Sequence, residues 1–215
     1  SDAVINGYIT FMDKASMMVA RLVDPKPGDC ILDCCAAPGG KSMYMASLMD
    51  NTGSIMSCDI HAHKIELMES NASRLGVSIV QTKVQDATQL PNNWDSYFDR
   101  VLVDAPCSGL GILQKKLDMR WRKQESILSE LPPLQLDILE RAARTVKVNG
   151  YLIYSTCTLN YKENEEVVET FLQKHSEFTI VPVPQDFPLT SNNGMITTNP
   201  PKDDMDGFFM VKMQR

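Results

Sequence analysis

The sequence predicts an α/β fold, a doubly wound and mostly parallel sheet of the Rossmann-like kind with helices on both faces. Short apolar runs alternate with amphipathic helical segments along the 215 residues, and Gly- or Pro-containing breaks separate them. Strands and helices that alternate at this spacing form parallel sheets through right-handed crossovers. No repeat, low-complexity tract or internal boundary interrupts the pattern, so residues 1–215 are expected to form one domain.

The first half of the chain supplies most of the expected strands and helices. Apolar residues recur every three or four positions in the expected helices, at residues 15–22, 40–49 and 65–75. The segment 24–28, DPKPG, ends the first of these helices, and Gly76 ends the third. Continuous apolar or β-branched runs are expected as buried strands, at residues 30–34, 54–58, 78–83 and 98–104.

The second half continues the alternation. Leu134, Ile138, Ala142 and Val146 share one helical face, and a strand is expected over 150–155. Asn160 and Glu163 have the spacing of a capping box, which predicts a helix that runs through Leu172. Residues 181–202 are rich in Pro, Asn and Thr and are expected to form a long loop, followed by a last strand over 207–211.

Composition restricts the class of protein. Hydrophobic residues make up 43% and charged residues 22%, as in ordinary soluble domains, and no apolar run approaches the roughly 18 residues of a membrane span. No secretory signal is visible. The six cysteines form no C-x-x-C pair, and His61 and His63 have no further ligand nearby, so we expect a cytoplasmic protein without a metal site.

The charge pattern leaves nucleic-acid binding open. The formal net charge of -6 argues against a strong nucleic-acid binder, because phosphate affinity comes mainly from Lys and Arg. One basic cluster runs against this balance and contains Lys115, Lys116, Arg120, Trp121, Arg122 and Lys123. The cluster is either an RNA-binding patch or a solvated surface, and Trp121 is either a base-stacking side chain or a packing residue.

A Gly-rich turn follows the first expected strand. Small residues let the backbone approach a ligand closely, and the next helix offers free N–H groups to an anion. The turn has neither the dinucleotide spacing nor a P-loop, because the first P-loop glycine is missing. A tight turn without a ligand is the alternative. The candidate cofactor residues here are Cys35, Ala36, Ala37, Pro38, Gly39, Gly40 and Lys41.

Acidic residues follow the next three expected strands. Ligands of open α/β sheets bind beyond the carboxyl ends of the strands. There Asp59 is suited to ribose hydroxyls and Asp86 to an adenine amino group, and Asp104 lies after the fourth strand. Either of the first two would, alone, more often be a helix cap. Together the three favour an adenosine that carries no phosphates.

Two cysteines follow adjacent strands at the same edge. Cys107 comes shortly after Asp104, and Cys157 follows the fifth strand. A single cysteine is usually a small buried hydrophobic residue, but two here favour chemistry. A thiolate that adds to carbon 6 of a pyrimidine makes carbon 5 nucleophilic, while a carboxyl group can protonate ring nitrogen 3. A free thiol has a pKa of about 8.5, so the site must favour the thiolate.

The motifs resemble those of the Sun-type, or nucleolar-protein-type, RNA cytosine-5 methyltransferases over nearly the whole chain. The matching segments are DCCAAPGGK at 33–41, FDRVLVDAPCSG at 98–109, YSTCT at 154–158, ENE at 163–165 and DGFF at 206–209. Among these enzymes the chain looks most like the bacterial ones that act on 16S ribosomal RNA. Those carry an N-terminal RNA-binding domain, which implies that residues 1–215 are the catalytic part of a longer protein.

The resemblance also implies roles for single residues. Cys157 would be the nucleophile, Cys107 would assist release of the methylated product, and Asp104 would contact the target base beside the cofactor methyl group. Residues 35–41 with Asp59, Asp86 and Asp104 would bind S-adenosylmethionine. DNA cytosine methyltransferases have similar chemistry, but their nucleophile resembles Cys107 in position, so the presence of Cys157 separates the two classes.

Other functions remain as alternatives. The same chemistry on transfer RNA is one, and an inactive RNA-binding ribosome-assembly factor is another, although the intact Asp104, Cys107 and Cys157 speak against lost activity. A nicotinamide-dependent oxidoreductase is disfavoured, since the dinucleotide motif is missing and both cysteines would be unexplained. The expected partner is RNA, with no membrane or metal, and the expected oligomeric state is a monomer.

Overall fold

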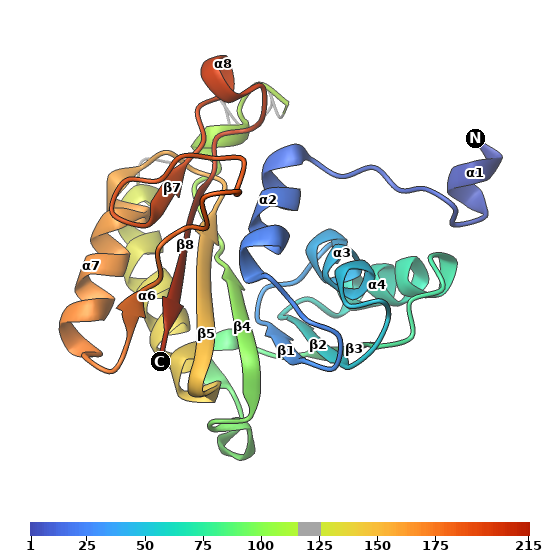
Figure 1. Ribbon diagram of the computed structural model, residues 1–215, viewed down its shortest axis with the longest axis horizontal. Helices are drawn as coiled ribbons and strands as arrows, with labels where there is room; N and C mark the ends of the chain where they lie inside the picture. Colours follow the sequence, from blue (N-terminus) through green and yellow to red (C-terminus); the bar gives the residue numbers. More distant parts are fainter. Residues whose placement is uncertain (116–125) are drawn as a thin grey trace.

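The computed structural model describes residues 1–115 and 126–215 and forms a layered α/β domain (Figure 1). The strands of its sheet lie in the order β3-β2-β1-β4-β5-β8-β6, and β7 pairs with β8 outside this path. Their bounds are β1 Cys30–Asp33, β2 Ser54–Asp59, β3 Val80–Val84, β4 Phe98–Asp104, β5 Val146–Thr156, β6 Thr179–Ile180, β7 Met195–Thr197 and β8 Phe209–Gln214.

The sheet is parallel over its first five strands and antiparallel around β8. Strands β3, β2, β1, β4 and β5 pair in parallel with their neighbours, whereas β5, β6 and β7 each pair antiparallel with β8. The chain first builds outward from β1 to β3 and then returns to place β4 on the other side of β1. The reversal creates a switch point between β1 and β4, where open α/β sheets bind ligands.

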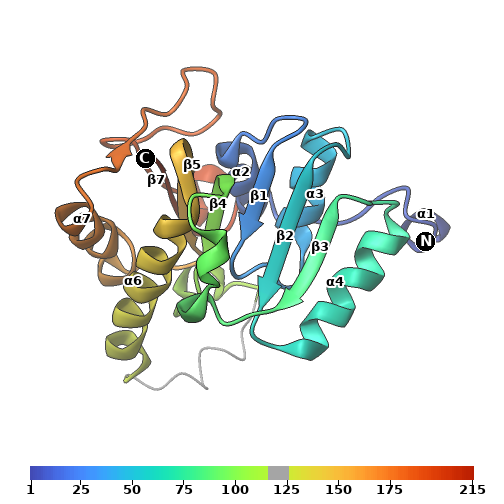
Figure 2. The same cartoon turned by 90° about the horizontal axis from the view of Figure 1, so that it is seen from below.

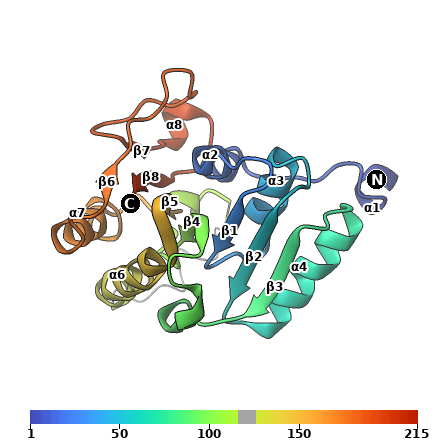
Figure 3. The same ribbon diagram turned by 60° about the horizontal axis from the view of Figure 1, so that its bottom comes forward.

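Helices cover both faces of the sheet (Figures 2 and 3). Helices α2 and α3 pack on one face and α6 and α7 on the other, while α4 lies along β2 and β3. The bounds are α1 Asp2–Ile5, α2 Lys14–Val23, α3 Gly40–Leu48, α4 Ala62–Arg74, α6 Ile127–Thr145, α7 Glu165–Lys174 and α8 Pro200–Asp203. No helix within residues 1–115 and 126–215 combines the length and the apolar character needed to cross a bilayer.

Alternating side chains of the central strands fill the two halves of the core. In β4, Leu102 packs with α2 and α3, whereas Val101 and Val103 point to the face covered by α6 and α7. The same alternation separates Ile153 from Tyr154 in β5, because successive side chains of a strand point to opposite faces. A strand buried on both sides therefore has a continuous apolar sequence. The predicted doubly wound, mostly parallel fold is confirmed.

Several predicted boundaries move in the second half. Strand β4 spans the predicted 98–104, but β5 begins at Val146, which was expected to end the preceding helix. Asn149 adopts a positive φ of 64° within β5, and the register with β4 shifts between Phe98 and Arg100. This irregularity hides the first part of the strand from a pattern search. The last strand is also displaced, to Phe209–Gln214.

The capping-box prediction at Asn160 was wrong. The Asn160 side chain accepts from the backbone N–H of Lys162 and caps only a short 3-10 turn over Tyr161–Glu163. Helix α7 starts after this turn, at Glu165. Glu163 is fully buried and accepts hydrogen bonds from distant residues, so its carboxylate does not cap a helix. The predicted loop over 181–202 was partly wrong too, since it contains β7 and α8.

Candidate active site

A cavity of about 570 Å³ lies beyond the carboxyl ends of the parallel strands, at the switch point. Its wall brings together segments that are up to 123 positions apart, from Cys34 to Cys157. Of the residues predicted from the sequence, those that line it are Cys35, Ala37, Asp59, Asp86, Asp104, Cys107 and Cys157. Parallel strands bring their carboxyl ends to one edge, which explains this convergence.

The Gly-rich turn follows β1 at this edge of the sheet. Gly39 has a φ of 95° and lies against helix α4, where an added Cβ would come within 2.9 Å of the Met68 side chain. Gly40 then starts α3, whose first backbone N–H groups have no partner inside the helix. Ala36 is buried, and its N–H donates to the carbonyl of Cys58, while Pro38 is exposed. Gly39 thus lets the turn pack closely on helix α4, whereas the sequence suggested a close approach to a ligand.

A buried polar network below this turn fits a polar ligand. Ser57 Oγ donates to Ser42 Oγ at 2.8 Å, and Ser42 Oγ donates to Oδ2 of Asp33 at 2.7 Å. The other oxygen of Asp33, Oδ1, is one of two fully buried side-chain atoms among the described residues that have no hydrogen-bond partner. Burial raises the pKa of Asp33 to about 7. Asp33 itself does not line the cavity, but Cys34 and Cys35 directly after it do. A cationic amino group that reached Oδ1 from this end of the cavity would supply the missing donor.

Asp59 and Asp86 occupy the cavity wall and also accept hydrogen bonds from nearby backbone N–H groups. Asp59 is only 7% exposed, and its Oδ1 accepts the backbone N–H of His61 at 3.0 Å. Asp86 Oδ1 accepts both the backbone N–H and the hydroxyl of Thr88, at 2.8 and 2.7 Å. Both residues thus line the pocket, but only Asp86 acts as a cap, of the 3-10 turn over Ala87–Gln89, whereas helix α4 has no side-chain cap. Their carboxylates are held still at the edge where a ribose and a base amino group would lie.

Some pocket residues were missed by the sequence reasoning. Ile60 and Leu134 line the cavity although 57% and 40% of their surface is exposed. Exposed apolar side chains beside a polar cavity suit the flat face of a base. Ile60 had a usable signal, because it directly follows Asp59. Leu134 had none, since a helical pattern does not reveal which residue of a helix stays uncovered.

Lys41, at the end of the Gly-rich turn, contacts Asp104. Its Nζ is 2.6 Å from Oδ2 of Asp104, and both side chains are largely buried. Burial alone would lower the pKa of Lys41, but the carboxylate of Asp104 raises it above its usual value. Ser155 Oγ donates to the other carboxylate oxygen, Oδ1, at 2.8 Å. Asp104 therefore has a donor on each oxygen, an arrangement that suits an ionised carboxylate.

The two predicted cysteines are in direct contact. The sulfur atoms of Cys107 and Cys157 lie 3.2 Å apart, and the N–H of Cys157 donates to the sulfur of Cys107 at 3.3 Å. A hydrogen bond from Cys107 lowers the pKa of Cys157 against the opposing effect of burial. The same hydrogen bond, together with burial, raises the pKa of Cys107 well above its usual value. These opposite pKa shifts favour the thiolate form at Cys157 and the thiol form at Cys107.

Most of the basic cluster cannot be related to this cavity. Of the basic cluster, Lys116, Arg120, Trp121, Arg122 and Lys123 lie outside the described residues. Lys115 forms ion pairs with Asp13 and with Asp206. Within the described part of the chain, no three His, Cys, Asp or Glu side chains are grouped as metal ligands would be.

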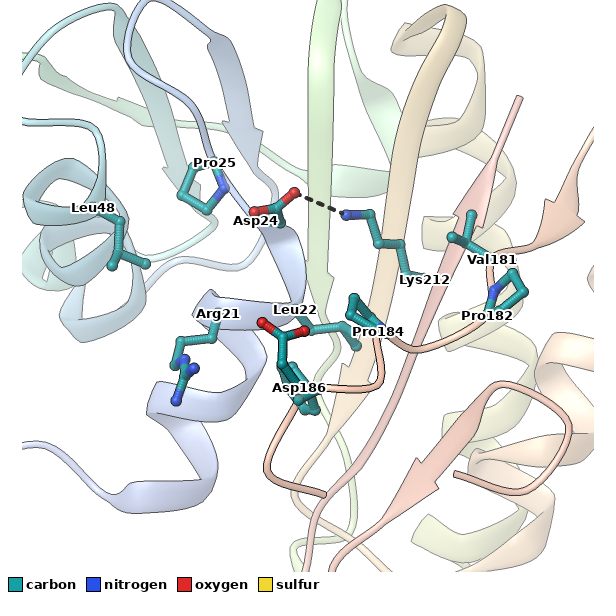
Figure 4. A pocket seen from close by; sticks show the side chains of 11 residues that line it. Arg21, Leu22, Asp24, Pro25, Leu48, Val181, Pro182, Pro184, Asp186 and Lys212 are labelled. Carbon is teal, nitrogen blue, oxygen red and sulfur yellow. Dashed lines mark ion pairs between the residues drawn. The ribbon is translucent and has the colours of Figure 1, made fainter. Parts of the chain in front are cut away.

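A second cavity, of about 270 Å³, lies between the end of α2 and the segment that follows β6 (Figure 4). It shares no lining residue with the first cavity and contains no cysteine. Lys212 is nearly buried in its wall, with Nζ 3.9 Å from Oδ2 of Asp24. The cysteine chemistry therefore belongs to the cavity at the switch point.

The fold and the pocket define a class I S-adenosylmethionine-dependent methyltransferase. An S-adenosylmethionine-dependent O-methyltransferase from Thermotoga maritima shares the fold at 17% identity, with a TM-score of 0.58 over 100% of this chain and 70% of that chain. The chain belongs to the RsmB/F family of 16S rRNA methyltransferases, whose model matches residues 20–214. The family expected from the motifs is confirmed.

Relatives of higher identity agree with this assignment. The probable ribosomal RNA small subunit methyltransferase B of Bacillus subtilis is 40% identical over 98% of this chain and 48% of the relative. The crystal structure of PH0851 has 35% identity and a TM-score of 0.95 over 100% of this chain and 49% of its own. NSun6 from Pyrococcus horikoshii with SFG, an analogue of S-adenosylmethionine, has 32% identity and a TM-score of 0.89, covering 100% and 55%. The chain spans about half the length of the curated relatives it matches.

Proposed function

We propose that this domain methylates carbon 5 of a cytosine in 16S ribosomal RNA through a covalent adduct with Cys157. The observation that carries the proposal is the contact between the sulfur atoms of Cys107 and Cys157, at 3.2 Å, at the edge of the cavity that also contains Asp104. Two cysteines of opposite protonation preference beside a carboxylate match the needs of a thiolate-addition mechanism. The family and its relatives support ribosomal RNA as the substrate.

The cofactor would be held by groups around the cavity. Asp59 and Asp86 would accept hydrogen bonds from the nucleoside, the Gly-rich turn would approach the methionine part, and Asp33 Oδ1 would accept from its amino group. Bound S-adenosylmethionine supplies an electrophilic methyl group. The cavity lies beside Asp104 and both cysteines, so a cytosine placed against them would face the cofactor side of the pocket.

The protein groups then divide the chemical work. The Cys157 thiolate adds to carbon 6 of the cytosine, and this makes carbon 5 nucleophilic. Asp104, fixed by Lys41 and Ser155, accepts a hydrogen bond from the exocyclic amino group of the base and orients the ring. Lys41, expected to serve only the cofactor, also places a cation beside the base. The positive charge of Lys41 stabilises the negative charge that the addition places on the ring.

Release requires the reverse step. After methyl transfer a base removes the proton from carbon 5, and the bond between carbon 6 and the Cys157 sulfur breaks. Cys107 keeps its proton because its pKa is raised, and it donates this hydrogen to the Cys157 sulfur. A donor to the departing thiolate makes it a better leaving group. The geometry thus supports the predicted division between a nucleophile and a release group.

The chain would act as part of a longer protein. Its relatives are about twice its length, and we propose that an RNA-binding segment outside residues 1–215 contributes to substrate affinity. All six cysteines are free, as a cytoplasmic site of action requires.

The test compares the chain with Cys157→Ala and Cys107→Ala, using a labelled methyl donor and either 16S ribosomal RNA or transfer RNA. Cys157→Ala is expected to abolish both 5-methylcytosine and the protein–RNA adduct, whereas Cys107→Ala should accumulate adduct. Cys30→Ala is the control, because Cys30 lies outside the cavity. Methylation of transfer RNA alone would change the substrate assignment. Cofactor binding without methylation of either RNA would favour an assembly factor, or a need for a further RNA-binding segment.

A further inference from the structure

A buried carboxylate sits behind the loop that carries Cys107. Glu163 has no exposed surface, and its Oε2 accepts the backbone N–H of Ser108 at 2.8 Å and Nε2 of Gln135 at 3.0 Å. Its Oε1 accepts Nδ2 of Asn160 at 3.0 Å. Among the described residues no cation pairs with this carboxylate, and burying it is costly, so its three neutral donors must offset the lost hydration. One of these donors belongs to the residue that directly follows Cys107.

Gln135 also contacts Pro106, the residue before Cys107. Nε2 of Gln135 donates also to the carbonyl oxygen of Pro106, at 2.9 Å. Pro106 and Ser108 are therefore both held, one through Gln135 and one through Glu163. The backbone of Cys107 is fixed on both sides without any contact to its sulfur.

The next residue, Asn164, holds the neighbours of Cys157 in the same way. Thr156 Oγ1 donates to Oδ1 of Asn164 at 2.5 Å, and Nδ2 of Asn164 donates to the carbonyl of Thr158 at 3.0 Å. Asn164 is 1% exposed. Its two contacts hold the residues on either side of Cys157. The two loops are also joined by Ser108 and Thr158, whose hydroxyl oxygens lie 2.8 Å apart.

We propose that Glu163 and Asn164 are positioning residues that together set the separation between the two catalytic sulfur atoms. Adjacent residues of one turn hold the two cysteine loops, so neither loop can shift without straining the other. We call the contacts of Glu163 and Asn164 with the two cysteine loops the clamp. The catalytic role of the clamp rests on the proposed function. The separation itself does not, because it is a property of the free protein.

The chemistry of the side chains explains their identity. A carboxylate offers acceptors on both oxygens, as three donors require, whereas the amide of Gln would turn an NH₂ group toward a donor. Asn at position 164 offers one acceptor and one donor, which match the Thr156 hydroxyl and the Thr158 carbonyl. Asp could satisfy only the first of these.

The distance can be measured by disulfide formation between Cys107 and Cys157 under the thiol oxidant diamide. Two S–H bonds break and one S–S bond forms, while the azo group of diamide takes up the two electrons and two protons. The variants are Glu163→Gln, Asn164→Ala and Asn164→Asp, and the control is Glu166→Gln, an exposed glutamate in the same region. The crosslinked peptide is quantified by mass spectrometry, which separates it from pairs that involve the other four cysteines.

Glu163→Gln and Asn164→Ala should each slow crosslinking about tenfold or more relative to Glu166→Gln, since each loses a buried hydrogen bond. Both should still bind S-adenosylhomocysteine, whose proposed contacts lie around Asp59 and Asp86. Asn164→Asp keeps one contact, so its crosslinking rate should lie between those of Asn164→Ala and Glu166→Gln. The midpoint of Cys157 alkylation against pH should also rise in the slowed variants, because the thiol donor moves away.

Crosslinking at the control rate in both folded variants would overturn the proposal, even if methylation were lost. Asn164→Ala is an independent test, because it leaves the Glu163 carboxylate and its contacts with the Cys107 loop intact. Neither readout requires RNA. If the variants slow crosslinking, the proposal on Glu163 and Asn164 stands whether or not the chain methylates RNA, so the two proposals fail separately.

Discussion

Lys41 Nζ lies 2.6 Å from Oδ2 of Asp104, although Lys41 belongs to the first turn of α3, Asp104 ends β4, and the two are 63 positions apart. The pair spans the switch point between β1 and β4 and joins the Gly-rich turn to the proposed catalytic group. A displacement at one end of the cavity can therefore reach the other through a single contact.

This pair should contribute to stability as well as to activity. Breaking a largely buried pair leaves an uncompensated charge and costs about 3–5 kcal/mol. Lys41→Met and Asp104→Asn should each lower the free energy of unfolding and abolish methyl transfer. The double variant should be less destabilised than the sum, by about 0.5–3 kcal/mol. Additive effects in urea denaturation would show that the two side chains do not interact.

The reactivity of Cys157 should depend on Cys107. The hydrogen bond from Cys107 lowers the pKa of Cys157 below its usual value. Cys107→Ala removes the donor, so the pH at which Cys157 is half-maximally alkylated by iodoacetamide should rise. Cys107→Ser retains an O–H donor and should restore part of the shift. An unchanged midpoint in Cys107→Ala would contradict the assignment of donor and acceptor.

Asp59 should be needed for cofactor affinity. A hydrogen bond to a charged group is worth about 1.5–3 kcal/mol, so Asp59→Asn should weaken S-adenosylhomocysteine binding roughly tenfold to a hundredfold. Calorimetry measures this change directly. Asp186→Asn is the matched control, since Asp186 lines the second cavity. A larger loss in the control would place the cofactor in that second cavity.

Gly111 should tolerate no side chain. Its N–H donates to the carbonyl of Cys157, and a Cβ at this position would lie 1.8 Å from the backbone oxygen of Gly207. Gly111→Ala should therefore destabilise the fold by about 1–3 kcal/mol and slow adduct formation, because the backbone must move. Gly40→Ala is the stability control, since a Cβ added there would have no atom within 4 Å. Equal thermal midpoints for the two variants would disprove the contact.

Lys212 should make stability depend on alkaline pH. Burial, helped by the charge of Arg100, lowers its pKa from 10.5 to about 8. Because the folded state loses this proton before the unfolded state does, the contribution of Lys212 to stability increases as pH rises from about 8 to 10.5.

Lys212→Met should therefore stabilise the protein at neutral pH, by an upper limit of about 3 kcal/mol at 1.36 kcal/mol per pKa unit. The advantage should vanish at pH 10.5. Lys202→Met, at an exposed lysine, should show a small difference that does not change with pH. A constant advantage of Lys212→Met would mean that packing, and not charge burial, is responsible.

The mostly parallel α/β fold and the edge that carries the site were predictable because they depend on local pattern and chain order. Asp104, Cys107 and Cys157 each follow an apolar strand, and parallel pairing brings such positions together. The partner of Lys41 was not predictable, because side-chain direction across the switch point depends on the twist of the assembled sheet.

Glu163 shows a different limit of sequence reasoning. The spacing from Asn160 is that of a helix cap, and nothing local reveals that Ser108 and Gln135 supply its donors. Strand β7 was missed for a related reason. Its three residues pair with β8, so the segment becomes a strand only after the sheet has formed.

The position of β8 has a consequence for synthesis of the protein. Strand β8 lies between β5 and β6 in the sheet, but it follows both in the sequence. On the ribosome, β5 and its attached Cys157 emerge first, with one edge of backbone groups unpaired. An unpaired edge can recruit other strands, so the nascent chain passes through a period of aggregation risk. That risk ends when residues 209–214 enter the gap, which happens only after every residue of the catalytic cavity has been synthesised.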